Sequence, residues 1–255
     1  MSKFELKDKI AIVTGGAGGI GTCIALEYAK AGANVVVASR SQESLDKVAA
    51  EIKVLGSKSL AITTDVCVPE QVDNMVRQTL DSFGRIDILV NNAGGALSVK
   101  KVEELSFEEW NATIGLNLTG TFLCSVAVGK VMIEQKSGKI INVSSVAGIK
   151  GSPSMAHYGA AKAGVINLTG CLASAWAQHN VNVNCIAPGL TATEGIKHWG
   201  VLPPDKNEDG TPVPRLLFPH GPEDVADLAV FLASSASDHI SGEIIPVRGL
   251  VTIDR

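Results

Sequence analysis

Short apolar runs alternate with longer amphipathic segments along most of the chain, and no other feature limits the fold as strongly. The runs are continuous and rich in Val and Ile, which is typical of strands that are covered on both faces. Strands that alternate with helices form a parallel sheet with helices on both sides. The sequence therefore predicts an α/β fold with a doubly wound parallel sheet, in one domain over residues 1–255.

The expected elements follow from these periods and from the glycines and prolines beside them. We expect strands at 9–15, 34–39, 59–65, 86–94, 138–145, 181–189 and 243–247, and helices at 20–31, 43–55, 69–83, 106–135, 156–178 and 222–234. Ser106 and Glu109 have the spacing of a capping box. Residues 190–221 hold five prolines and no strong period. We expect this region to be a lid or loop over the substrate.

Charge and cysteine usage exclude several classes of protein. A net charge of -4 argues against a nucleic-acid or acidic-membrane surface. The five cysteines are scattered without a C-x-x-C pair, as in a reducing compartment, and the histidines lack metal-binding spacing. The first nine residues do not resemble a signal peptide, and no segment gives about 18 uninterrupted apolar residues. We expect a cytoplasmic protein without a metal site and without nucleic-acid or membrane partners.

A glycine-rich stretch, TGGAGGIG at 14–21, stands between the first expected strand and its helix. Both G-x-G-x-x-G and G-x-x-x-G-x-G spacings fit it. Missing side chains let backbone amides approach a diphosphate, and the N-terminus of the following helix favours its negative charge. The context predicts a dinucleotide site in a Rossmann fold, formed by Gly15, Gly16, Gly18, Gly19, Ile20 and Gly21.

The end of the second expected strand indicates which dinucleotide binds. A site for NAD(H) needs a carboxylate there for the ribose 2′-hydroxyl, whereas this chain has Ser39 and Arg40. A serine beside a guanidinium suits a 2′-phosphate. We therefore expect NADP(H) to be preferred, while NAD(H) and a solvated Arg40 remain the alternatives.

A tyrosine and a lysine stand four residues apart on the expected helix 156–178, so Tyr158 and Lys162 share a face. A nearby ammonium stabilises a phenolate, and we expect Lys162 to lower the pKa of Tyr158 enough for general acid/base catalysis. Ser145 ends the fifth expected strand and can bind a substrate oxygen. His157 lies about 100° round the helix from Tyr158, and we expect it to point away.

Several further motifs complete a recognisable series. They are Asp65 with Val66, NNAG (91–94), Asn117 in NLTGTF, NVSS (142–145), YGAAK (158–162) and APGLTAT (187–193). With the glycine stretch, and in this order and spacing, they make the sequence similar to the short-chain dehydrogenase/reductase family over nearly its whole length. The resemblance implies hydride transfer between a nicotinamide and a ketone or secondary alcohol.

The resemblance also implies roles for matching residues. Tyr158 would be the catalytic acid/base, Lys162 would hold the nicotinamide ribose, and Ser145 would orient the substrate oxygen. Asn117 would lie at a helix distortion and support a water that links Lys162 to solvent. The other cofactor contacts implied are Asp65 and Val66 at the adenine, Asn92, Ala93 and Gly94 in the cleft, and Pro188, Gly189, Thr191 and Thr193 at the nicotinamide.

The substrate is less constrained than the chemistry. A small carbonyl or alcohol compound is expected, with a 3-oxoacyl thioester as the specific hypothesis. An NAD-dependent alcohol or polyol dehydrogenase of the same family is the alternative. A regulator that senses the dinucleotide without turnover belongs to another class, and such proteins typically lose the Tyr or Lys that this chain retains. The resemblance further implies a homotetramer.

Overall fold

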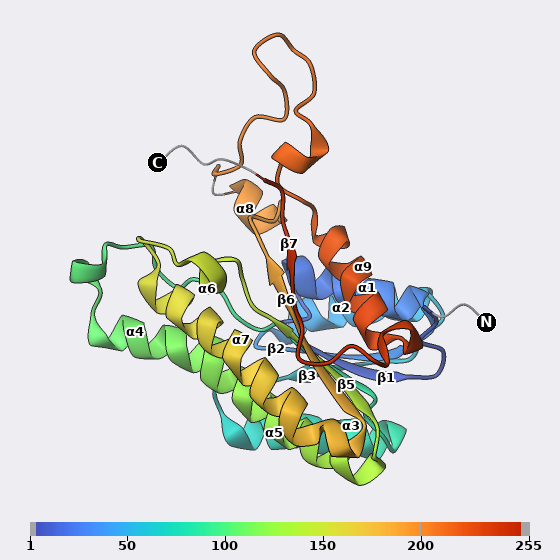
Figure 1. Ribbon diagram of the computed structural model, residues 1–255. Coiled ribbons are helices and arrows are strands. Elements are labelled where there is room, and N and C mark those ends of the chain that lie inside the picture. The colour runs from blue at the N-terminus through green and yellow to red at the C-terminus, as the bar shows by residue number, and fades with distance from the viewer. Residues whose placement is uncertain (1–3, 199, 251–255) are drawn as a thin grey trace.

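The computed structural model describes residues 4–198 and 200–250. They form a parallel sheet of seven strands with helices packed on it (Figure 1). The strands are β1 (Ile10–Thr14), β2 (Asn34–Ser39), β3 (Ser59–Thr63), β4 (Ile88–Asn91), β5 (Gly138–Val143), β6 (Val181–Pro188) and β7 (Ile244–Val247). Their order is β3-β2-β1-β4-β5-β6-β7. The winding direction reverses between β1 and β4, and ligands of such sheets bind outside the strand ends at this point.

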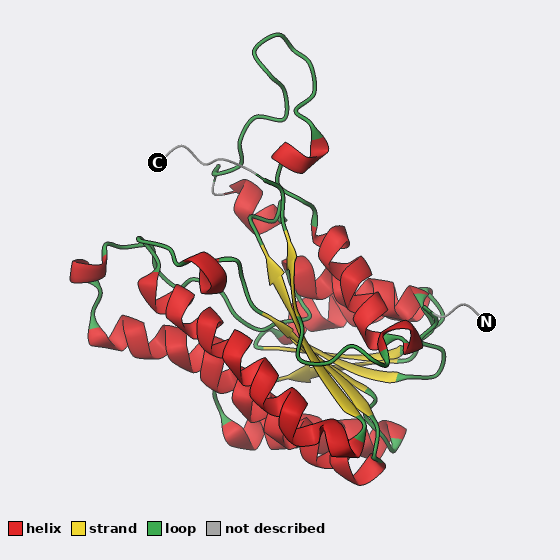
Figure 2. Ribbon diagram, viewed as in Figure 1, coloured by secondary structure: helices red, strands yellow, loops and turns green. Residues whose placement is uncertain are grey.

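Helices cover both faces of the sheet (Figure 2). One face carries α1 (Gly19–Lys30), α2 (Gln42–Val54) and α9 (Pro222–Ala233), and the other carries α3 (Pro69–Phe83), α4 (Phe107–Ile114), α5 (Gly120–Gln135) and α7 (Ala156–Trp176). Neighbouring residues of one strand serve opposite cores: Val13 packs against the first group of helices and Ile12 against the second. The predicted burial on both faces is confirmed for β1, β2, β4, β5 and β6, whereas the edge strands β3 and β7 are partly exposed. The doubly wound fold is confirmed.

The predicted strands and long helices are all present, with shifted ends. The capping box at the start of α4 is confirmed, because Ser106 Oγ accepts from the Glu109 amide while the Glu109 carboxylate accepts from the Ser106 amide. The fourth strand ends at Asn91 instead of residue 94. The amides of Asn92 and Ala93 donate to Thr14 Oγ1, at 3.1 Å each, so they leave the sheet ladder.

Several short elements carry too little periodicity to be predicted. They are η1 (Val102–Glu104), the π-helical turn η2 (Gly115–Thr119), α6 (Ala147–Lys150), η3 (Ala177–His179), α8 (Glu194–His198), η4 (Arg215–Leu217) and η5 (Ser235–Ser237). The most consequential is η2, which joins α4 to α5 without a break and carries Asn117.

The continuous stretch 107–135 is long and apolar enough to cross a membrane by length and composition alone. Part of its apolar surface lies against the sheet, where Cys124, Val128 and Met132 are fully buried, while Phe107, Trp110 and Phe122 are exposed. A helix at the centre of a layered α/β protein has the same composition. The stretch is therefore accounted for as part of the core.

Residues 190–221 lie beyond the carboxyl ends of β6 and β7, and in Figure 1 the orange loop between α8 and α9 extends away from the sheet. The region is held at its base, because Thr191 and His220 form a parallel bridge and the Ala192 amide donates to the His220 carbonyl at 2.8 Å. The two ends of the region are thus fixed side by side while its middle extends outward.

Candidate active site

The carboxyl ends of β1, β4, β5 and β6 enclose a cleft of about 400 Å³ where the winding direction reverses. It brings together most of the residues singled out in the sequence: Gly15, Gly18, Gly19, Ile20, Asn92, Ala93, Gly94, Ser145, Tyr158, Lys162, Pro188, Gly189, Thr191 and Thr193. Gly16, Gly21 and Asn117 lie behind its walls. Residues from distant parts of the chain thus meet around one space.

The glycine stretch uses its missing side chains in different ways. Gly15 and Gly19 have positive φ angles of 63° and 48°, which favour glycine. A Cβ on Gly21 would overlap the Gly15 carbonyl oxygen, and one on Gly16 would lie 2.8 Å from a carbonyl oxygen of β1. A Cβ on Gly18 would meet no protein atom within 4 Å. Gly15, Gly16, Gly19 and Gly21 thus shape a tight turn. Gly18 leaves open space at the N-terminus of α1, as a diphosphate requires.

Thr14, which the sequence analysis missed, fastens this turn to the 92–94 segment. Its hydroxyl accepts from the amides of Asn92 and Ala93 and donates to the Val90 carbonyl at 3.2 Å. The Asn92 side-chain amide donates in return to the carbonyls of Thr14, at 3.1 Å, and Gly15, at 3.2 Å. A hydroxyl residue directly before a glycine turn is the signal that could have revealed this link.

Asn117 is fully buried in η2 and grips the segment that follows the NNAG motif. Its Oδ1 accepts from the Gly95 amide at 2.9 Å, and its Nδ2 donates to the Gly95 carbonyl at 3.0 Å. A Cβ on Gly94 would lie 2.6 Å from Asn117 Oδ1 and 3.0 Å from Lys162 Nζ. Glycine at 94 therefore lets Asn117 and Lys162 approach the same point.

Lys162 is 3% exposed, and its Nζ donates to the Val143 carbonyl at 2.9 Å. Burial lowers the pKa of Lys162 to about 8, because the charged form loses its hydration. The Nζ atom lies 5.6 Å from the centroid of the Tyr158 ring. Both side chains face the same cleft from neighbouring turns of α7.

Burial raises the pKa of the Tyr158 phenol, and a hydrogen bond with Ser145 opposes part of this increase. The expectation that Lys162 lowers this pKa is wrong for the protein alone. Burial disfavours the charge of Lys162 as well, and its ammonium is directed to the Val143 carbonyl. Tyr158 is thus a phenol that keeps its proton at neutral pH and can donate it.

The two serines at the end of β5 have different partners. Ser144 Oγ is buried and donates to the Lys162 carbonyl at 2.7 Å, which ties α7 to β5. Ser145 Oγ accepts from the Ala147 amide at 3.2 Å and lines the cleft beside Tyr158. Ser145 is therefore the serine whose hydroxyl can reach a substrate oxygen.

Four of the predicted cofactor residues lie outside this cleft, at the ends of β2 and β3. Ser39 Oγ is buried without a partner among the described residues, and Arg40 is exposed. The Asp65 carboxylate accepts a hydrogen bond from the Cys67 amide at 2.9 Å, so one of its oxygens stabilises a turn. Val66 is 5% exposed and packs toward α5.

The threonines after β6 have structural partners of their own. Thr191 Oγ1 donates to the Gly189 carbonyl at 3.2 Å and lies 3.3 Å from His220 Nε2. Thr193 Oγ1 accepts from the Ile196 amide at 3.4 Å, at the start of α8. Both also line the cleft, so their structural contacts do not remove them from the candidate site.

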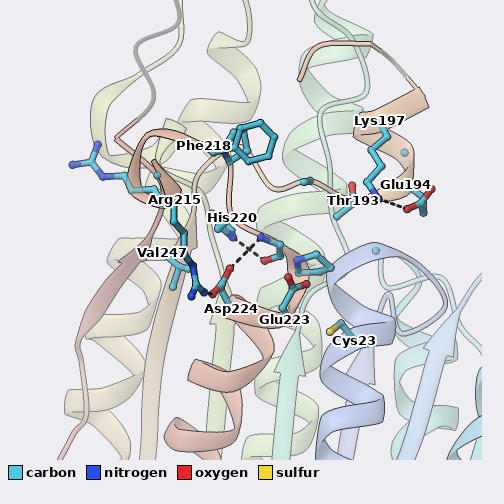
Figure 3. A pocket seen from close by; sticks show the side chains of 18 of the residues that line it. Cys23, Thr193, Glu194, Lys197, Arg215, Phe218, His220, Glu223, Asp224 and Val247 are labelled. Carbon is cyan, nitrogen blue, oxygen red and sulfur yellow. Dashed lines mark hydrogen bonds and ion pairs between the residues drawn. The ribbon is translucent and has the colours of Figure 1, made fainter. Parts of the chain in front are cut away.

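A second cavity, of about 1190 Å³, lies between α1, α8 and α9 under the 190–221 region, and Figure 3 shows part of its lining. It shares Gly19 and Thr193 with the cleft, so the two spaces adjoin. Two local ion pairs occur on its walls, Arg215–Asp224 at 2.6 Å and Lys197–Glu194 at 2.7 Å. Residues of the 190–221 region form part of the wall of this second cavity.

Comparisons with known proteins agree with this geometry. The chain is 42% identical over 249 residues to a 3-oxoacyl-[acyl-carrier-protein] reductase of Synechocystis sp., covering 96% of this chain and 97% of the relative. It is 38% identical to an NAD-dependent glycerol dehydrogenase of Listeria innocua, covering 98% and 96%. A solved 7α-hydroxysteroid dehydrogenase in complex with NADH and 7-oxo glycochenodeoxycholic acid superposes with a TM-score of 0.89 at 30% identity, covering 99% and 97%.

The model of the family described as short chain dehydrogenase matches residues 9–200. This span contains the glycine turn, the 92–95 segment, Ser145, Tyr158 and Lys162. The relatives are reductases and dehydrogenases that interconvert C=O and CH–OH groups with a nicotinamide dinucleotide. The chain therefore belongs to the short-chain dehydrogenase family and is an oxidoreductase of this kind.

Proposed function

We propose that this protein is an NADPH-dependent reductase of 3-oxoacyl thioesters. The observation that carries the proposal is the convergence of Ser145, Tyr158 and Lys162 on one cleft beside the glycine turn. The similarity to the 3-oxoacyl-[acyl-carrier-protein] reductase of Synechocystis sp. over nearly both full lengths supports the substrate class. A 3-oxoacyl-[acyl-carrier-protein] reductase of Thermotoga maritima, 38% identical, supports it further.

Each side chain has a chemical task in this reduction. The Ser145 hydroxyl binds the substrate carbonyl oxygen, and Tyr158 Oη donates its proton to that oxygen as negative charge develops there. Lys162, with a pKa of about 8, is largely protonated at neutral pH and would hold the nicotinamide ribose hydroxyls. Asn117 fixes the wall next to Lys162 and supports a water there. When bound, the nicotinamide supplies the hydride.

The cofactor preference rests on the end of β2. Ser39 Oγ is buried and has no partner within residues 4–198 and 200–250, and an unpartnered buried hydroxyl costs free energy until a ligand satisfies it. Arg40 follows it, with no carboxylate in this position to bind a ribose 2′-hydroxyl. The pair suits a 2′-phosphate. Gly15, Gly16, Gly18, Gly19, Ile20 and Gly21 would hold the diphosphate, Asp65 and Val66 the adenine, and Asn92, Ala93, Gly94, Pro188, Gly189, Thr191 and Thr193 the nicotinamide half.

An NAD-dependent alcohol or polyol dehydrogenase is the second candidate, favoured by the similarity to the glycerol dehydrogenase of Listeria innocua. The same cleft would serve it in the opposite direction, with Tyr158 as the base. The regulator without turnover is set aside, because the chain belongs to a family of enzymes and retains Ser145, Tyr158 and Lys162.

The remaining proposals concern the setting of the site. Residues 190–221 are a lid over the substrate within a single domain, supported by their place on the wall of the second cavity. A homotetramer is supported by exposed Phe107, Trp110 and Phe122 on α4 and α5. A cytoplasmic location is supported by five cysteines that are all free.

The test is a steady-state assay of the purified protein that follows NADPH or NADH absorbance. Acetoacetyl-CoA is the ketone probe, with glycerol and cyclohexanol assayed in the oxidising direction. We expect acetoacetyl-CoA reduction with NADPH to have the highest kcat/KM, and Arg40→Asp to shift preference toward NADH by about tenfold or more. Turnover of glycerol with NAD alone would replace the proposal with the second candidate.

A further inference from the structure

One side of the cleft includes a short segment, residues 95–100, that begins at Gly95. It is fastened at two points by hydrogen bonds and at a third by the ion pair of Lys100 with Glu109 of α4, at 2.7 Å. The first fastening is the double hydrogen bond between Gly95 and Asn117. The second involves the first turn of α7, where Ser98 Oγ lies 3.2 Å from His157 Nε2 and the Lys100 amide donates to the Ser154 carbonyl at 2.9 Å. Residues 95–100 are thereby held against the catalytic helix.

His157 is a buried side chain with a specific hydrogen bond. It is 1% exposed although it directly precedes Tyr158, and among the described residues Ser98 is the hydrogen-bond partner of its Nε2. Its Nδ1 is buried without a partner among the described residues. Burying an imidazole with one nitrogen unsatisfied costs free energy. A leucine of similar volume would avoid this cost, so the bond to Ser98 is the feature that only the histidine provides.

This contact acts on the part of the wall that follows Gly94 and is separate from the contacts that hold the glycine turn. Ser98 is three residues from Gly95, which lines the cleft together with Ser145 and Tyr158. The dinucleotide turn at 15–21 is fastened separately, through Thr14 and Asn92. Tyr158 is held independently by α7, which Ser144 ties to β5. Loss of the His157–Ser98 bond would therefore loosen one wall and leave the reacting groups in place.

We propose that His157 is a positioning residue that fastens the 95–100 segment beside Tyr158 and so keeps the substrate side of the cleft in its binding-competent form. This rests on the proposed function, because the wall must face a ketone for the effect to appear in kinetics. When a wall is competent for only part of the time, the apparent KM rises by the inverse of that fraction. The turnover of bound substrate is unchanged.

The test compares Ser98→Ala, His157→Leu and the double variant with the native enzyme. We expect each single change to raise the KM for acetoacetyl-CoA about fivefold, the effect of one lost hydrogen bond, with kcat within about twofold and the Kd of NADPH unchanged. The double variant will be no worse than His157→Leu, because both changes remove the same bond. His157→Gln keeps an amide group near the Nε2 position that can donate to or accept from Ser98, and it will restore most of the native KM. Val99→Ala, at an exposed neighbour, is the matched control.

Additive effects of the two single changes, or a native KM in Ser98→Ala, would overturn the proposal. A loss of kcat in His157→Leu that is not restored in His157→Gln would also overturn it, because that result indicates a general packing role for His157. Hydrogen exchange tests the proposed role of His157 even if the proposed substrate class is wrong. The Lys100 amide will exchange faster in Ser98→Ala than in Val99→Ala whichever ketone the enzyme reduces, and equal exchange rates would overturn the proposal on their own.

Discussion

The walls of the cleft and the proposed lid, residues 190–221, differ in how their side chains are held. Asn117, Ser144 and Lys162 are at most 3% exposed, and each bonds to a different part of the chain. In the lid, Arg215 and Leu216 are largely exposed, and the ion pairs are local or at the surface. The residues proposed for the chemistry are therefore held by contacts with distant parts of the chain, whereas the middle of 190–221 is exposed and has few such contacts.

The largest effect expected is the loss of turnover in Tyr158→Phe. The phenol donates the proton in reduction, and removal of such a donor lowers kcat by a factor of about 100 or more. The ring remains, so the Kd of NADPH will change little. Steady-state kinetics and fluorescence titration measure the two quantities. A variant with substantial kcat would show that the buried walls do not supply the acid.

The variant Lys162→Met tests the burial of Lys162 through the pH dependence of stability. The pKa of Lys162 is lowered from 10.5 to about 8, so between these values the unfolded chain binds a proton that the native protein does not. The native protein therefore gains stability from this group as pH rises from about 8 to 10.5, and it lacks that gain below pH 8. We expect a contribution of about 3 kcal/mol that is absent in Lys162→Met.

Urea unfolding of both proteins at several pH values measures this difference, and Lys197→Met in the lid is the control. The Lys197 side chain is 53% exposed, so this variant is the exposed counterpart of the buried Lys162. Parallel stability profiles for the native protein and Lys162→Met would contradict the buried position of Lys162.

Two glycine substitutions compare the regions directly. The new Cβ in Gly21→Ala overlaps the Gly15 carbonyl oxygen, so the turn must shift, at a cost of about 1–3 kcal/mol and with weaker NADPH binding. In Gly195→Ala of α8 the new Cβ meets no atom within 4 Å, and a change below about 1 kcal/mol is expected. Thermal unfolding and NADPH titration distinguish the two. Equal losses would show that the lid is as tightly packed as the cleft.

The smallest effect expected is that of Arg215→Ala. Its ion pair with Asp224 joins the lid to α9, but the arginine side chain is 86% exposed, and such pairs contribute less than about 1 kcal/mol. Stability will hardly change, while KM values for ketones of different size will shift relative to one another. An unfolding midpoint lowered by many degrees would show that this region contributes strongly to the stability of the fold.

The fold was largely predictable because its determinants are local. Continuous Val and Ile runs identified the strands, and helical periods with flanking glycines identified the long helices. The spacing of Tyr158 and Lys162 depends only on helix geometry, and so it indicated a shared face before any packing was known. The glycine turn was recognisable for a similar reason, since Gly15 and Gly19 adopt backbone angles that other residues avoid.

The candidate site was predictable only in part, because some roles depend on what surrounds a residue. The role of Thr14 in holding the 92–94 segment appears only when β1 and β4 are neighbours. The bond between His157 and Ser98 joins residues 59 positions apart. The separate roles of Ser144 and Ser145 follow from which of them faces Lys162.

The sequence by itself determined the alternation of strands and helices, the glycine turn and the set of polar groups available for chemistry, because these depend on periods and backbone preferences within a few residues. Only the tertiary structure decided the strand order, the grip of Asn117 on Gly95 and the direction of the Tyr158 pKa. A pKa depends on the solvent that folding removes from around a group. Packing of distant segments sets that quantity, and spacing along the chain does not reveal it.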